Sequence, residues 1–325
     1  MMSRALVKLG ILSLLVYVAF LLKTQVDALD KKTHSALTHY IVAATYEKMG
    51  DIDKAIAEYQ QALKIDYKNP VIHVSLGAAY LKKHEFPRAV EELNLAVKLD
   101  PESVEPHAIL ALLYFSQEKL TEAGKEYELA LKKAAALEPQ NVSIYKSLAA
   151  VYLQQKDYQA AENTYQLIIK LSPNDAETHF FLGNVYDLQQ KWPETQQELQ
   201  KAIAFKPDYH EALNYLGYLY VEKGLNLNDA ERLIKRAVEL EPENGAYIDS
   251  LGWLYYKQGK FKDAVKELER AAALIDDPVV LDHLGDTYLK LKDMNKARAS
   301  WEKSLQLDPA QDTVKKKIEE TRLHQ

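Results

Sequence analysis

The sequence predicts an all-α fold in which short helical hairpins repeat along the chain as a solenoid. One observation is a tyrosine that recurs at intervals of 33 to 38 residues through most of the 325-residue chain. A second is a Gly or Ala three residues before each of these tyrosines. A third is that each interval holds two stretches of apolar residues at helical spacing, parted by a polar turn. Units of this length bury their apolar faces only by stacking on their neighbours.

The first element is a predicted targeting segment, residues 1–28. Fourteen residues without a charge run from Leu9 to Leu22, with Lys8 before them and Lys23 after them. At about 1.5 Å per helical residue this run is shorter than a bilayer core of about 30 Å, which favours a signal peptide cleaved after Ala28. The alternative is an uncleaved anchor over residues 5–22 whose flanking lysines reach the headgroups. Both alternatives predict that the rest of the chain is exported and is periplasmic or otherwise extracytoplasmic.

The repeated unit follows a linker predicted over residues 29–35. The small residue before each tyrosine lets two helices approach closely, and a second small residue follows most of the tyrosines by nine positions, as Ala55 and Ala89 do. A proline closes most units, where it cannot continue a helix. The tyrosines are Tyr46, Tyr80, Tyr114, Tyr152, Tyr186, Tyr220, Tyr255 and Tyr288.

These offsets resemble the tetratricopeptide repeat family, in which a Leu-Gly or Leu-Ala pair, Tyr, Ala and Pro recur in this order. Segments such as LNYLGYLYVEKG match most closely. The resemblance implies a right-handed α-α superhelix with a concave groove. The expected repeats are residues 36–69, 70–103, 104–141, 142–175, 176–209, 210–244, 245–277 and 278–311.

Two irregularities have simple interpretations. Four extra residues at 133–136 add about one helical turn, so they should lengthen the second helix of the third repeat without rotating its apolar face. Residues 312–325 are mostly charged, with Val314 and Ile318 four positions apart. They are expected to form a helix that caps the end of the stack.

Composition excludes several classes of function. The net charge is -6 and basic residues are interleaved with acidic ones, so no basic face is available for nucleic acid. The chain has no Cys, which excludes disulfides and thiolate chemistry. No phosphate-binding loop, HExxH or Gly-x-Ser-x-Gly motif is present. We therefore expect no catalysis and no cofactor.

Histidines at the fourth position of four repeats give the one pattern that suggests a metal site. They are His39, His73, His107 and His179. Equivalent positions of stacked hairpins lie at least about 8 to 10 Å apart, whereas one zinc ion needs nitrogens at about 2.1 Å. We therefore expect no metal, and expect each histidine to pack and form hydrogen bonds within its own repeat.

The resemblance implies that positions 2, 5, 9 and 12 of each first helix line the groove. In the N-terminal half the predicted partner-binding residues are apolar: Val74, Leu81, Leu112 and Phe115. In the C-terminal half they become acidic, amide and aromatic: Phe180, Asn184, Asp187, Asn214, Tyr218, Asp249, Trp253, Tyr256, Asp282 and Asp286. Such a surface suits hydrophobic anchors at one end and a basic or amide-rich segment at the other.

The predicted function is protein binding by a scaffold, adaptor or assembly factor of the cell envelope. Its partners are expected to be other proteins, with membrane contact only through residues 5–22 if that segment stays uncleaved. The alternative is a structural subunit of a larger envelope complex that uses the convex or edge surfaces of the solenoid. The sequence leaves this choice open.

Overall fold

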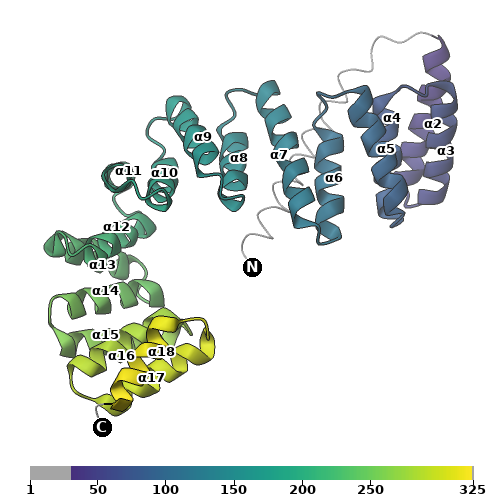
Figure 1. Cartoon of the computed structure of the whole chain (residues 1–325). Helices are drawn as coiled ribbons and strands as arrows, with labels where there is room; N and C mark the ends of the chain where they lie inside the picture. Colours follow the sequence, from purple (N-terminus) through teal and green to yellow (C-terminus); the bar gives the residue numbers. More distant parts are fainter. Residues whose placement is uncertain (1–30, 324–325) are drawn as a thin grey trace. The chain divides into compact units, whose positions relative to one another are not determined.

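The computed structural model describes residues 31–323, and this part of the chain is entirely helical outside its turns. It contains seventeen helices and no strand (Figure 1). The predicted all-α class is therefore confirmed. The helices are α2 (Lys31–Lys48), α3 (Ile52–Ile65), α4 (Pro70–Lys82), α5 (Phe86–Leu99), α6 (Glu105–Ser116), α7 (Leu120–Leu137), α8 (Val142–Gln154), α9 (Tyr158–Leu171), α10 (Ala176–Leu188), α11 (Trp192–Phe205), α12 (His210–Glu222), α13 (Leu227–Leu240), α14 (Gly245–Lys257), α15 (Phe261–Leu274), α16 (Pro278–Lys290), α17 (Met294–Leu307) and α18 (Asp312–Leu323).

The chain divides into two compact units, one ending at Leu171 and the other beginning at Ser172. Helices α2 to α9 form four hairpins in the first unit. Helices α10 to α17 form four more in the second, followed by α18. Within each unit every hairpin packs on the next, so each unit is a solenoid of the predicted α-α type.

Small residues allow the two helices of a hairpin to touch, as predicted. A Cβ added at Gly77 would lie 2.8 Å from the Leu93 Cγ, and one at Gly252 would lie 2.6 Å from the Leu268 Cγ. The alanines of the second helices, such as Ala55, are fully buried at the same seam. The backbones therefore approach at a distance that a larger residue would prevent.

The same tight turn follows each first helix, and its central residue lies four positions after the tyrosine. The residue there has a positive φ, and the next backbone N–H donates to the carbonyl of the tyrosine, at 2.9 Å from Glu85 to Tyr80 and 2.8 Å from Lys191 to Tyr186. A residue in the left-handed αL conformation lets the backbone N–H groups that follow a helix donate hydrogen bonds to its last carbonyls. The turn positions are Gly50, His84, Glu118, Lys156, Gln190, Gly224, Gly259 and Lys292.

The irregular segments fold largely as the sequence indicates. Helix α7 has 18 residues where α5 and α9 have 14, so the four extra residues do add one turn to it. Helix α18 buries Val314 and Ile318 against the last hairpin and covers it.

The predicted linker needs a correction. Helix α2 begins at Lys31, inside the range 29–35, because no Gly or Pro interrupts the helix there. The predicted targeting segment lies outside the described residues. Between residues 31 and 323, no helix combines the length and apolarity needed to cross a membrane.

Candidate protein-interaction surface

The fourth-position histidines form local hydrogen bonds, as expected. Each Nδ1 lies beside a glutamate 19 residues later, on the second helix of the same hairpin. The distances are 2.6 Å for His39 to Glu58, 2.6 Å for His73 to Glu92, 2.7 Å for His107 to Glu126 and 2.5 Å for His179 to Glu198. Because a carboxylate only accepts, the ring N–H donates in each pair.

His73 shows what such a pair does to protonation. Its Nε2 also lies 3.0 Å from the Tyr67 carbonyl oxygen, so both ring nitrogens face acceptors. The hydrogen bond to Glu92 raises the pKa of His73, although burial acts in the opposite direction. Among residues 31–323 no cluster of three or more His, Asp or Glu side chains could hold a metal ion. These pairs are therefore packing elements.

None of the fourteen predicted groove residues is fully exposed. Three are buried, with exposed fractions of 4% for Val74 and 7% for both Asp249 and Trp253, and the others are half-buried. Side chains of successive first helices cover one another at these positions. The half-buried residues keep part of their surface for contact, whereas the three buried ones do not.

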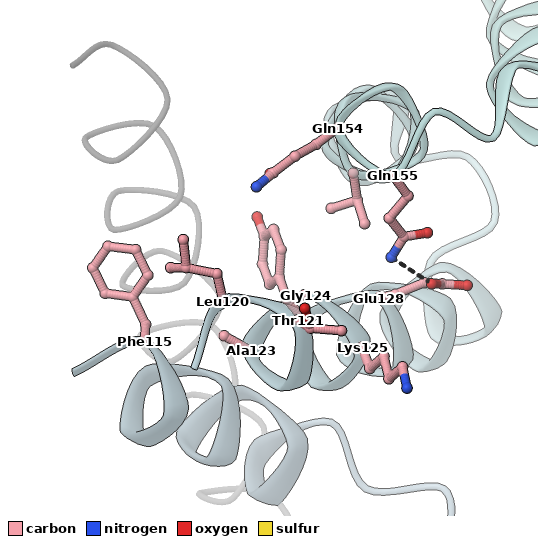
Figure 2. A pocket seen from close by; sticks show the side chains of 11 residues that line it. Phe115, Leu120, Thr121, Ala123, Gly124, Lys125, Glu128, Gln154 and Gln155 are labelled. Carbon is pink, nitrogen blue, oxygen red and sulfur yellow. Dashed lines mark hydrogen bonds between the residues drawn. The ribbon is translucent and has the colours of Figure 1, made fainter. Parts of the chain in front are cut away.

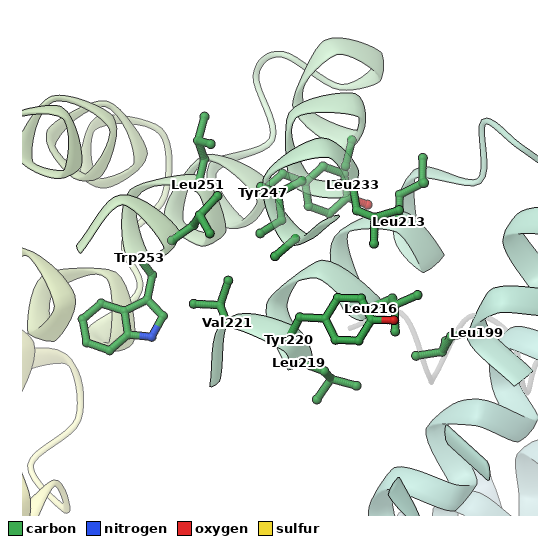
Figure 3. Packing of buried hydrophobic residues seen from close by; sticks show 14 residues of the cluster. Leu199, Leu213, Leu216, Leu219, Tyr220, Val221, Leu233, Tyr247, Leu251 and Trp253 are labelled. Atoms are coloured by element: carbon green, nitrogen blue, oxygen red, sulfur yellow. The ribbon is translucent and has the colours of Figure 1, made fainter. Parts of the chain in front are cut away.

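Trp253, which the sequence predicts to be a groove residue, is buried in the structure. Its ring stacks on His283, with 3.9 Å between centroids, and on Tyr256, at 4.5 Å. Its Nε1 donates to Glu222 at 2.6 Å. Figure 3 shows the buried cluster of the second unit that Trp253 joins. A stacked and hydrogen-bonded indole holds neighbouring hairpins together, so Trp253 belongs to the core.

The carboxylates of the predicted groove have partners inside the chain. Asp249 lies 3.0 Å from the His283 Nδ1, and Asp187 accepts from the Tyr215 hydroxyl at 2.7 Å. Lys317 of α18 donates to Asp282 at 2.7 Å and to Asp286 at 2.8 Å. The capping helix thus neutralises the carboxylates next to it.

Burial controls protonation at this end of the surface. It raises the pKa of Asp286, and the bond to Lys317 offsets only part of that increase. Burial of Lys317 lowers its own pKa, but hydrogen bonds to the two carboxylates outweigh this and leave the value raised. Burial likewise raises the pKa of the Tyr218 hydroxyl to about 12, with a smaller contribution from Glu222. The tyrosine is therefore a neutral hydrogen-bonding group.

Amide and aromatic side chains remain among the half-buried groove residues of the second unit, a set that we call the stripe and that includes Asn214 and Tyr218. Asn214 lies four residues before Tyr218 on α12, so the two share a helix face. The Asn214 Oδ1 is buried and accepts no hydrogen bond. An unsatisfied buried acceptor costs about 1–3 kcal/mol, so a partner N–H that reached it after the Asn214 side chain turned outward would recover this free energy.

Comparison with known proteins agrees with this architecture. A family model described as the Cilia and flagella-associated protein 70 C-terminal domain matches residues 23–247, more than half of the chain. Two tetratricopeptide repeat models match residues 225–279 and 280–311. The chain belongs to the tetratricopeptide repeat family. Comparison with curated proteins gives no match.

Solved structures share the fold of this tetratricopeptide repeat protein at low sequence identity. The APC/C hetero-tetramer Cut9-Hcn1 has a TM-score of 0.57 at 20% identity, over 86% of this chain and 54% of that one. Naa15/Naa10 bound to HypK-THB has a TM-score of 0.54 at 17% identity, over 86% of this chain and 43% of that one. Yeast Tom70 has a TM-score of 0.51 at 18% identity, over 93% of this chain and 66% of that one. This chain thus spans about half of the Cut9-Hcn1 chain, and these likenesses show the fold alone.

Sequence reasoning missed Lys317, which lies beyond the repeats but partners two groove carboxylates. It also missed Gly124 of α7, beside which the structure leaves an open cavity. A position-by-position comparison of the second helices could have found Gly124. The corresponding residues are Ile56, Val90, Glu162, Gln196, Glu231, Val265 and Arg298, all of which carry a long or branched side chain.

Proposed function

We propose that this tetratricopeptide repeat chain is a non-catalytic adaptor or assembly factor of the cell envelope that holds an extended segment of a partner protein. Proteins of this family generally provide elongated concave surfaces for protein binding. The single observation that supports the groove is the unsatisfied Asn214 Oδ1 on the stripe that also carries Tyr218. Its natural complement is a backbone or side-chain N–H of a partner.

Of the two partner chemistries that the sequence left open, we favour the amide-rich segment. The carboxylates Asp187, Asp282 and Asp286, which would attract a basic segment, already accept hydrogen bonds inside the chain. A cation would have to compete with those bonds, whereas an amide would add one to Asn214. The aromatic ring of Tyr218 supplies rigid apolar area beside it.

Site-specific photocrosslinking in living cells tests this proposal. A benzophenone amino acid replaces Tyr218 in one variant and Arg232 in a matched control. Arg232 is exposed on α13, the second helix of the same hairpin. We expect adducts with a partner protein from position 218 and none from position 232. Adducts from position 232 alone would support the alternative, a structural subunit that uses its convex surface.

We also propose that the repeats lie outside the cytoplasm, on the basis of the apolar run from Leu9 to Leu22. A C-terminal alkaline phosphatase fusion in bacterial cells should be active, because this enzyme needs an oxidising compartment for its disulfides. N-terminal sequencing then separates cleavage after Ala28 from a retained anchor. An inactive but intact fusion would exclude export.

A further inference from the structure

A cavity of about 530 Å³ lies in the first unit, where the third hairpin meets the fourth. Figure 2 shows it bounded by the first half of α7, the end of α6 and the end of α8. Leu120, Tyr127 and Val151 give it apolar walls, and Gln154 and Gln155 stand on the α8 side. Its volume falls within the range of about 300–1,000 Å³ that is usual for ligand pockets.

The cavity exists because Gly124 presents no side chain to the next hairpin. A Cβ built on Gly124 meets nothing within 4 Å, unlike those at Gly77 and Gly252. A glycine in the middle of a helix costs roughly 0.5–1 kcal/mol relative to alanine, and Gly124 recovers none of this through close packing. In the free chain, Gly124 therefore makes no packing contact that would offset its cost to helix stability.

Three of the seven other hairpins have a branched aliphatic side chain at the equivalent position, and the other four have Glu162, Gln196, Glu231 and Arg298. Ile56 and Val90 pack there against a buried cluster that includes Tyr80, and Val265 packs against the cluster of Tyr288. In each case a branched aliphatic side chain bridges one hairpin to the next. At Gly124 the same seam is left open on its α7 side.

The one carboxylate that lines the cavity has partners inside the chain, and the lining also includes the exposed Lys125. Gln155 donates from Nε2 to the Glu128 Oε2 at 3.1 Å, and Lys132 also binds Glu128, at 2.6 Å. The carboxylate is thus already satisfied. Gln154 is exposed and its amide extends beside the opening in Figure 2. It can bind the backbone that flanks an inserted side chain.

We infer that the cavity at Gly124 is a binding pocket for a branched aliphatic side chain, such as isoleucine or leucine, presented by a partner protein. The side chain takes the place that Ile56 and Val90 fill from within the chain. This inference rests on the proposed protein-binding function but uses a site in the first unit that does not include Asn214. It predicts that an apolar anchor, and not a charged residue, determines recognition here.

The test uses N-acetyl-isoleucine N-methylamide as a probe, titrated against the full-length chain and followed by backbone NMR. We expect saturable shifts at Thr121, Lys125 and Gln154, and none with the asparagine analogue of the probe. Gly124→Val should weaken probe binding about 10- to 100-fold, the factor expected from withholding a buried aliphatic site. Glu122→Val, which adds the same side chain at an exposed position of α7 outside the cavity, should bind like wild type.

Gly124→Ala provides a smaller filling and should weaken binding less than Gly124→Val. Both variants should unfold no more readily than wild type, because the space is open. Absence of saturable shifts in wild type, or equal binding by Gly124→Val, would overturn the inference. The probe is read without any partner, so this failure is distinguishable from a failure of crosslinking at Tyr218.

Discussion

The same substitution, glycine to alanine, should have opposite effects at two places in this array. At Gly285 an added Cβ would lie 2.4 Å from the Trp301 Nε1 and 2.5 Å from its Cδ1. Trp301 is fully buried and its ring is rigid, so the clash cannot be relieved by moving a flexible end. At Gly124 the added Cβ meets nothing within 4 Å.

The magnitudes follow from two opposing contributions. Overpacking a core costs about 1–3 kcal/mol, while replacing a mid-helix glycine by alanine gains roughly 0.5–1 kcal/mol. Gly285→Ala should therefore destabilise the second unit by about 1 kcal/mol, and by at most about 2.5 kcal/mol. Gly124→Ala should stabilise the first unit by the helix contribution alone.

Urea unfolding monitored by two signals measures both effects. All three tryptophans, Trp192, Trp253 and Trp301, lie in the second unit, so fluorescence reports that unit while circular dichroism reports the whole chain. With a slope of about 2 kcal/mol per molar urea, Gly285→Ala should lower the fluorescence midpoint by roughly 0.5 M, and by at most about 1.25 M. Gly124→Ala should leave that midpoint unchanged. A midpoint for Gly285→Ala at or above that of wild type would refute the packing argument.

Four further predictions concern stability. The pKa of His73 is raised in the folded chain. Its contribution to the free energy of unfolding is therefore complete below the unfolded pKa of about 6.5 and is lost as pH rises through the folded pKa. In urea titrations, His73→Gln should reduce the loss of stability between about pH 6 and pH 8. Trp253→Ala should destabilise the second unit by about 3–5 kcal/mol in calorimetry, and a loss below about 1 kcal/mol would contradict its core role. Lys317→Met leaves Asp286 without its cation, so it should lower the free energy of unfolding by about 1–3 kcal/mol near neutral pH and by less in acid, where the carboxyl is protonated. An equal loss at both pH values would be inconsistent with the ion pair. Chelators should leave the melting temperature unchanged, and a drop of several degrees would mean that a metal contributes to the fold.

Much of the fold is predictable here because the period itself carries the information. The tyrosine register places the turn four residues later, and the small residue three positions earlier marks a close contact that the structure shows at Gly77 and Gly252. The histidine pairs could also be predicted in outline, since stacking geometry rules out a shared metal. Their exact partners, such as Glu92 for His73, needed the structure.

The candidate surface was harder to predict. Helical periodicity gives the direction of a residue around its own helix, but exposure depends on what the next hairpin places over it. Trp253 points along the expected stripe and is nevertheless covered by His283. Asp282 and Asp286 could be predicted as acidic groove residues, but their partner, Lys317, could not, because it lies on the capping helix outside the repeat pattern.

Affinity measurement on two matched variants tests the central claim, that the stripe on the first helices binds the partner. Asn214→Ala removes the unsatisfied acceptor on α12, whereas Asn228→Ala makes the same change at an exposed position of α13 in the same hairpin. With the segment recovered by crosslinking as the ligand, Asn214→Ala should raise Kd about tenfold, equivalent to about 1.4 kcal/mol, without lowering the melting temperature. Asn228→Ala should leave Kd unchanged. Equal affinity of Asn214→Ala and wild type, together with a loss of binding by Asn228→Ala, would contradict the account and indicate the convex surface.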